Sequence, residues 1–170
     1  MRIKITRKYS KYQAVCEVLN KESRQALIDA ACGMYGAYWD LTLGRFFAIS
    51  AGDVSFLEIK RSPTVAQVFW LKGLEDFAKE FEQACKNVQM PKTLLRKNED
   101  QAARACLKMT PQESMLTFVQ KHFGLHSYRE AEQITLAEYM MARRAQYNEV
   151  VMQRRLEQLQ MAEIKKGQKK

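Results

Sequence analysis

The chain has 170 residues, a length typical of one domain, and 46% of them are hydrophobic, which excludes wholesale disorder. Seven glycines and three prolines are few for this length. Because strand-rich proteins need many turns, this scarcity favours long helices joined by few loops. The four cysteines form no C-x-x-C pair, so we expect reduced, mostly buried thiols and no zinc site.

The net charge of +9 is concentrated at the two ends of the chain. Residues 1–12 contain five basic residues and no acidic one, and residues 154–170 contain six basic residues and two acidic ones. Short basic ends suit contact with nucleic acid or with an acidic protein surface, and they equally suit solvated tails that aid solubility. No uncharged run is long enough to span a membrane, and the charged start lacks the apolar core of a signal peptide, so we expect no membrane partner.

Several elements are predicted near the start of the chain. Ile3 and Ile5 alternate with charged or polar neighbours, which indicates a short strand or an extended arm. A helix is then predicted over residues 11–19, followed by a second helix that begins near Glu22 and stops at Gly36. The predicted inner face of the second helix consists of Ala26, Leu27, Ala30 and Ala31.

The middle of the chain predicts a short apolar helix over residues 41–49, with Asp40 as its N-cap. Residues 54–60 indicate a short strand. A longer helix then begins with Ser62 as its cap. Gly73 lies inside this helix and indicates close packing against a neighbour or a slight bend.

Three capping boxes follow, each with a hydroxyl residue and a glutamate three positions later. They begin at Thr110, Ser127 and Thr135. The last box starts a helix with no glycine or proline from Leu136 to Ile164, a length of about 43 Å at about 1.5 Å per residue. Apolar residues thin out beyond Arg154, so we expect this end to project until it meets a partner.

These elements predict an all-α fold: a compact multi-helix bundle with a long, partly projecting C-terminal helix and a short N-terminal strand or arm. No internal repeat divides the chain, and no linker rich in Gly, Ser or Pro is present. We therefore expect one helical domain over residues 1–153 and a basic helical extension over residues 154–170.

No residue pattern in the chain matches a catalytic or metal site. His122 and His126 stand four apart, but Gly124 separates them and only Glu130 lies nearby as a third ligand, so we expect ordinary histidines. No G-x-S-x-G turn is present, and no cysteine has neighbours that would clearly lower its pKa. We therefore expect a non-enzymatic protein with no cofactor, no metal and no small-molecule substrate.

Carboxylates are abundant in the helix that contains Gly73. Glu75 and Asp76 alternate with Lys72 and Lys79 at three- and four-residue spacing. That spacing is typical of a solvated helix face and is far more common than a catalytic acid/base pair.

The last predicted helix carries the best candidates for contact with nucleic acid. The candidate residues are Arg143, Arg144, Tyr147, Arg154, Arg155, Lys165 and Lys166. The two arginine pairs are eleven residues apart, close to three helical turns, so both pairs return to nearly one face that could follow phosphates. Arginine is also enriched at protein interfaces, where its stem packs over apolar neighbours, and we favour that interpretation.

Two segments of the chain resemble small helical proteins of tailed phages. The run Trp39–Asp53 resembles the Leu-Thr-Leu-Gly-x-Phe openings of phage structural and tail assembly chaperone proteins. Residues Ile134–Tyr139, which lead into an Arg- and Gln-rich helix, are similar in style to the same proteins. The basic ends of this chain depart from that family, because chaperones of tape-measure proteins need not be basic.

This resemblance implies a phage assembly or virion structural protein that works through helix-mediated contacts with phage structural proteins or with a second copy of itself. Its expected location is the host cytoplasm or the virion. The predicted contact residues are Leu41, Leu43, Phe46, Phe47, Leu156, Leu159 and Ile164. The alternative function is a nucleic-acid-binding accessory protein that uses the basic terminal segments.

Overall fold

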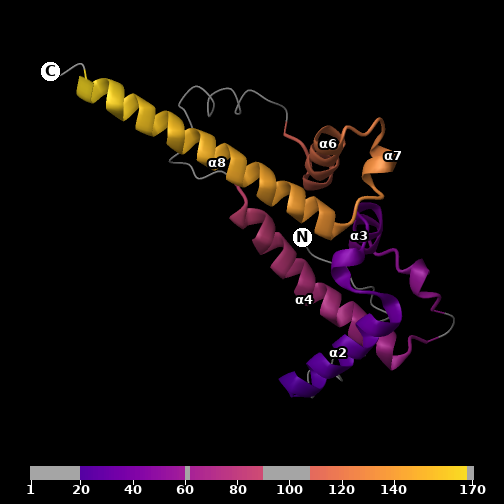
Figure 1. Cartoon of the computed structure of the whole chain (residues 1–170). Coiled ribbons are helices and arrows are strands. Elements are labelled where there is room, and N and C mark those ends of the chain that lie inside the picture. Colours follow the sequence, from indigo (N-terminus) through magenta and orange to yellow (C-terminus); the bar gives the residue numbers. More distant parts are fainter. Residues whose placement is uncertain (1–19, 60–61, 90–107, 168–170) are drawn as a thin grey trace.

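The computed structural model describes residues 20–59, 62–89 and 108–167 (Figure 1). The helices in these ranges are α2 (Lys21–Tyr35), η1 (Tyr38–Asp40), α3 (Leu43–Ser50), η2 (Ser55–Leu57), α4 (Val65–Asn87), α6 (Pro111–Phe123), α7 (Tyr128–Ala131) and α8 (Leu136–Gly167). The described part of the chain contains no strand, so the all-α prediction is confirmed. The predicted N-terminal arm and the helix over residues 11–19 lie outside the described residues.

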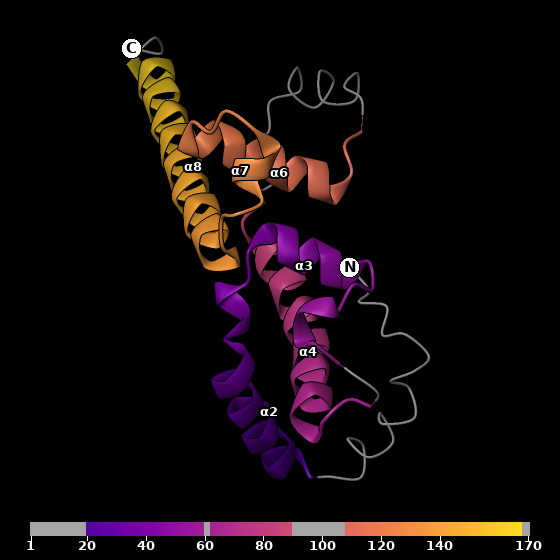
Figure 2. The same ribbon diagram turned by 90° about the vertical axis from the view of Figure 1, so that its right-hand side faces the viewer.

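The helices form two groups that meet at α3. α2 and α4 pack side by side and form one group, whereas α6 and α7 lie beside the first half of α8 and form the other (Figure 2). The far end of α8 extends away from both α2 and α4. Because α8 is one helix from Leu136 to Gly167, the predicted extension over residues 154–170 begins inside a continuous element.

Gly73 is a point of close approach between α4 and α2. A Cβ atom at this position would lie 2.6 Å from Ile28 Cγ2 and would also meet the Tyr38 hydroxyl. That hydroxyl donates a hydrogen bond of 3.0 Å to the carbonyl oxygen of Trp70, and the Trp70 indole N–H donates one of 3.0 Å to the carbonyl oxygen of Gly36. The prediction that Gly73 permits close packing is therefore confirmed.

The buried face of α2 differs from the predicted one. Ile28 and Ala31 are buried against α4, whereas Ala26, Leu27 and Ala30 are exposed. Apolar residues occur on both sides of this helix, so periodicity alone does not distinguish the buried face from the exposed one.

An aromatic cluster joins α4 to three other elements. The Phe81 ring lies at its centre, with its centroid 5.9 Å from that of Trp39, 5.4 Å from that of Phe46 and 6.1 Å from that of Tyr139. Tyr139, near the start of α8, contacts Phe118 of α6 edge to face at 5.7 Å. Tilted and edge-to-face pairs are favoured by the ring quadrupoles, so this cluster fixes the first turns of α8 against the rest of the protein.

The three predicted capping boxes start α6, α7 and α8. Thr110 and Thr135 each accept a hydrogen bond from the backbone N–H three residues later, and the glutamate at that position accepts one from the threonine backbone. At the box that begins with Ser127, Ser127 Oγ accepts a hydrogen bond from the Glu130 N–H, but the Glu130 carboxylate accepts one from the His126 N–H instead of the Ser127 N–H. Two boxes are therefore complete, and the third is only half formed.

Three predictions in the middle of the chain are wrong in detail. The N-cap of α3 is Thr42 and not Asp40, because Asp40 belongs to η1. The N-cap of α4 is Thr64, which forms a further capping box, and not Ser62. The segment predicted as a strand over residues 54–60 contains η2, since no second strand lies beside it in the described part of the chain.

The two segments that carry the phage resemblance meet in space. Thr42 and Thr135 form an isolated antiparallel bridge, and the residues that flank them exchange two backbone hydrogen bonds of 2.8 and 2.9 Å. Gly44 lies against this junction, where a Cβ atom would be 3.0 Å from the Cβ atom of Glu132. Because Thr42 caps α3 and Thr135 caps α8, the two segments together determine where α8 leaves the body of the protein.

Candidate protein-contact surface on the C-terminal helix

The first two turns of α8 are anchored in the core. Leu136, Tyr139, Met140 and Ala142 are buried, and Met140 Sδ lies 3.8 Å from the Cys85 thiol of α4. None of the side chains after Ala142 that the structure describes is fully buried. The start of α8 is therefore packed in the core, whereas much of the rest of the helix is exposed.

The four arginines predicted to form one basic face are divided between two faces. The Arg143 guanidinium lies over the Phe118 ring, 4.8 Å from its centroid, and donates to the Gln146 side chain at 3.2 Å. The Arg154 side chain is 18% exposed and forms an ion pair of 3.3 Å with Glu157. Both guanidinium groups are thus engaged within the protein, whereas those of Arg144 and Arg155 form no such contact among the described residues.

Arg144, Arg155 and Lys165 are exposed. Tyr147, which lies between the two arginine pairs in the sequence, is half-buried beside a hollow of about 210 Å³. The residues that line this hollow are Val88, Arg143, Gln146, Tyr147, Val150 and Val151. The Lys166 side chain lies outside the part of the chain that the structure describes.

A row of exposed apolar side chains runs along α8 on the side opposite Tyr139 and Arg143. Met141 is 62% exposed, Met152 62%, Leu156 51% and Leu159 63%. At about 100° per residue these four positions fall within about 60° of one another around the helix, and they span about 27 Å along it. We call these four residues the outer stripe. Among the described residues, the ring contacts of Tyr139 and Arg143 are on the other side of α8, and the four side chains of the outer stripe are exposed.

The predicted contact residues are only partly found on this surface. Leu156 and Leu159 belong to the outer stripe, whereas Ile164 is exposed but lies about 140° around the helix from Leu159. Sequence reasoning missed Met141 and Met152. Their eleven-residue separation, which equals about three helical turns, was a signal that could have identified them.

The remaining predicted contact residues are in the core. Leu41, Leu43, Phe46 and Phe47 are all buried, with Leu43 and Phe46 completely inaccessible. Their assignment to an external surface is therefore wrong. These side chains fill the space between α3, α4 and the junction with α8, which explains why this segment is so apolar.

A groove of about 430 Å³ near α8 contains Cys85, a residue type that can act as a nucleophile. It is lined by Ser50, Ala51, Ala78, Phe81, Glu82, Cys85, Thr110, Pro111, Gln112 and Met115. Burial raises the pKa of the Cys85 thiol, so the protonated form is favoured at neutral pH. A thiol held in this form is a poor nucleophile.

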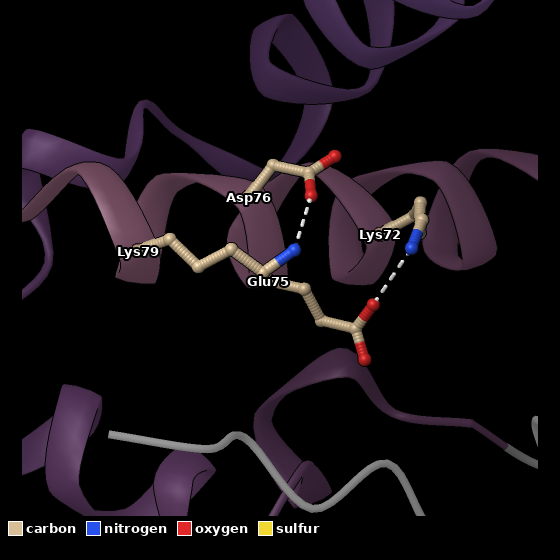
Figure 3. Close-up of polar contacts among 4 residues, drawn as sticks. All are labelled: Lys72, Glu75, Asp76 and Lys79. Atoms are coloured by element: carbon tan, nitrogen blue, oxygen red, sulfur yellow. Dashed lines mark hydrogen bonds and ion pairs between the residues drawn. The ribbon is translucent and has the colours of Figure 1, made fainter.

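Other titratable groups are engaged in ordinary structural contacts. On α4, Lys72 Nζ lies 3.0 Å from Glu75 and Lys79 Nζ lies 3.0 Å from Asp76 (Figure 3). The second pair is solvated as predicted, but the side chains of the first are largely covered. The His122 ring is stacked on Phe118, with centroids 5.4 Å apart. Ion pairs at three-residue spacing on one helix stabilise that helix modestly.

Neither a metal cluster nor a membrane-spanning helix is found among the described residues. No group of three or more His, Cys, Asp or Glu side chains in these residues is arranged to hold a metal ion. Among the described helices, none combines the length and the apolar character needed to cross a membrane. Comparison of the chain with models of protein families, with curated proteins and with solved structures gives no match.

Proposed function

We propose that this protein is a non-enzymatic assembly or structural protein that works by presenting α8 to another protein. The observation that carries the proposal is the outer stripe: four large apolar side chains, each more than half exposed, on one face of a helix anchored in the core at its other end. Exposed apolar rows of this kind are typical of surfaces that bury a partner helix or groove.

A phage origin is the more specific part of this proposal, with phage head or tail proteins as partners and the host cytoplasm or virion as location. It is supported by the resemblance of Trp39–Asp53 and Ile134–Tyr139 to small phage proteins. These segments pair at the bridge between Thr42 and Thr135, so their shared role is to orient α8. Such a junction would serve a protein whose working surface is the helix that leaves it.

The test is site-specific photocrosslinking in cells that make the chain together with the proteins encoded beside its gene. A photoreactive amino acid replaces Leu159 in one variant and Gln153, on another face of α8, in the control. We expect Leu159 to give one adduct of defined mass, to a structural protein or to a second copy, and Gln153 to give much less. Equal yields from both positions, or adducts spread over unrelated proteins, would contradict the proposal.

A second candidate function is nucleic-acid binding, and one observation favours it. Arg144 and Arg155 are both exposed and lie eleven residues apart, so their backbone positions are about 16 Å apart along the axis on one side of α8. Counterion release predicts that binding through these arginines and the basic ends weakens steeply between about 50 and 200 mM salt. A band-shift titration with duplex DNA at several salt concentrations measures this dependence, and no shift at the lowest salt would remove the candidate.

A further inference from the structure

The outer stripe is bordered by opposite charges on its two sides. Arg144 and Arg155 lie about 60–80° from its centre in one direction, and Glu149 lies about 60° from its centre in the other. All three side chains are exposed. The stripe is therefore an apolar seam with one basic border and one acidic border.

Two features of this arrangement, a methionine of the stripe and an arginine of the basic border, recur after eleven residues along α8. Met141 precedes Met152 by eleven residues, and Arg144 precedes Arg155 by the same interval. Eleven residues make about three turns of α-helix, so a pattern with this period stays nearly parallel to the helix axis. A straight seam of about 27 Å is long enough to pair with a second straight helix.

The border charges have no partners on their own helix. The positions three and four residues from Arg144 and Arg155 hold no acidic side chain, and those around Glu149 hold no basic one. Within the described residues no ion pair of Arg144, Arg155 or Glu149 is formed. These groups are thus available to a partner, in contrast to Arg154, which is paired with Glu157.

We propose that the partner of the outer stripe is the same stripe on a second copy of this chain, with the two α8 helices parallel and in register. In a parallel pair the basic border of each helix faces the acidic border of the other. Arg144 then lies beside Glu149 of the second copy, five residues further along, which is the separation between a g position and the following e position in a parallel coiled coil. By symmetry this ion pair forms twice.

The antiparallel alternative brings like charges together. With the two stripes centred on each other, Arg144 would lie beside Arg155 of the second copy, and Glu149 would lie beside Glu149. Like charges across a helix pair are destabilising, so the borders select the parallel orientation. Asn148 lies at the edge of the seam between Met141 and Met152. In the parallel pair it faces Asn148 of the second copy, and an Asn pair in the seam of a coiled coil favours one register.

The rest of the protein is compatible with this pairing. The outer stripe is on the side of α8 opposite Tyr139 and Arg143, so the part of α6 that contacts these two residues lies on the far side of α8 from the seam. The seam ends at Leu159, because Glu163 would face its own copy in register. The acidic border also disfavours a polyanion on this face, which distinguishes the pairing from the nucleic-acid alternative.

The inference rests on the proposed role of α8 as a contact helix, and light scattering and sedimentation of the full chain test it. We expect a dimer that dissociates on dilution. Leu156→Glu combined with Leu159→Glu should raise the dissociation constant at least tenfold. The matched control combines Met161→Glu with Ile164→Glu, which are exposed on other faces of α8, and should change it less than threefold. Circular dichroism verifies that both variants remain helical.

Charge reversal tests the orientation. Arg144→Glu and Glu149→Arg should each weaken self-association, and an equimolar mixture of the two variants should recover it, because both ion pairs re-form in the mixed dimer. In an antiparallel pair, Arg144→Glu would instead strengthen association through Arg155 of the second copy. An Asn148→Cys variant should form a disulfide-linked dimer on mild oxidation, beyond any formed by the wild-type chain.

Three results would overturn the inference: a strictly monomeric chain, stronger association of Arg144→Glu, or failure of the mixture to recover binding. A monomer that still gives a single Leu159 photoadduct with another protein would refute the pairing of copies and leave the proposed function intact. A monomer with no specific adduct would contradict both.

Discussion

Replacing Gly73 by alanine should destabilise this protein, although alanine is the better helix former. The new Cβ atom would lie 2.6 Å from Ile28 Cγ2, well inside the usual carbon–carbon separation of about 3.5–4.0 Å, and would also meet the Tyr38 hydroxyl. Ile28 is buried on α2, and Tyr38 is held by its hydrogen bond to Trp70 and by ring contacts. The collision therefore has to be relieved by separating α2 from α4 or by displacing Tyr38.

The expected magnitude follows from three contributions. Adding a methyl group to a filled core costs about 1–3 kcal/mol. Displacing Tyr38 breaks its 3.0 Å hydrogen bond to the Trp70 carbonyl, which contributes about 1 kcal/mol. The higher helix propensity of alanine acts in the opposite direction by about 1 kcal/mol. We therefore expect the free energy of unfolding to fall by about 1–3 kcal/mol.

Urea denaturation followed by circular dichroism measures this change, and Gly33→Ala is the matched control. Gly33 lies in α2, and a Cβ atom there meets nothing within 4 Å, so the same substitution should be neutral or stabilising by up to about 1 kcal/mol. Adding Tyr38→Phe to Gly73→Ala should recover part of the loss, since it removes one colliding atom. A Gly73→Ala protein as stable as the wild type would refute the packing argument.

Three further predictions concern α8 and its surroundings. Thr135→Ala should lower the free energy of unfolding by about 1 kcal/mol through loss of the N-cap, whereas Thr135→Ser should retain most of it, as urea midpoints will report. Burial raises the pKa of Tyr139 from 10.0 to about 12, so the contribution of this side chain to the free energy of unfolding is complete below about pH 10 and is lost as pH rises toward 12. Subtracting the pH profile of the stability of Tyr139→Phe from that of the wild type isolates this fall. Parallel profiles for the two proteins would contradict the prediction. Cys85 should react with iodoacetamide more slowly in the native protein than in urea, because burial raises its pKa, and mass spectrometry of the labelled peptide measures both rates.

Much of the local structure could be predicted from the sequence, because its causes lie within a few residues of one another. The capping boxes at Thr110 and Thr135 need only a hydroxyl and a carboxylate three positions apart. The long uninterrupted helix after Thr135 follows from the absence of glycine and proline. Gly73 was identified because a glycine inside an apolar helix usually has a packing reason.

The burial of particular faces was decided by the tertiary structure. Leu27 and Ile28 are adjacent and both apolar, yet only Ile28 lies against α4, because the position of α2 is determined by the Tyr38 ring and by Gly73, which is 45 residues further along the chain than Ile28. Likewise Arg143 and Arg144 are chemically alike, but Phe118 from another helix engages one of them and leaves the other exposed. Helical periodicity specifies which residues share a face, whereas only packing partners distant in sequence determine whether that face meets protein or solvent.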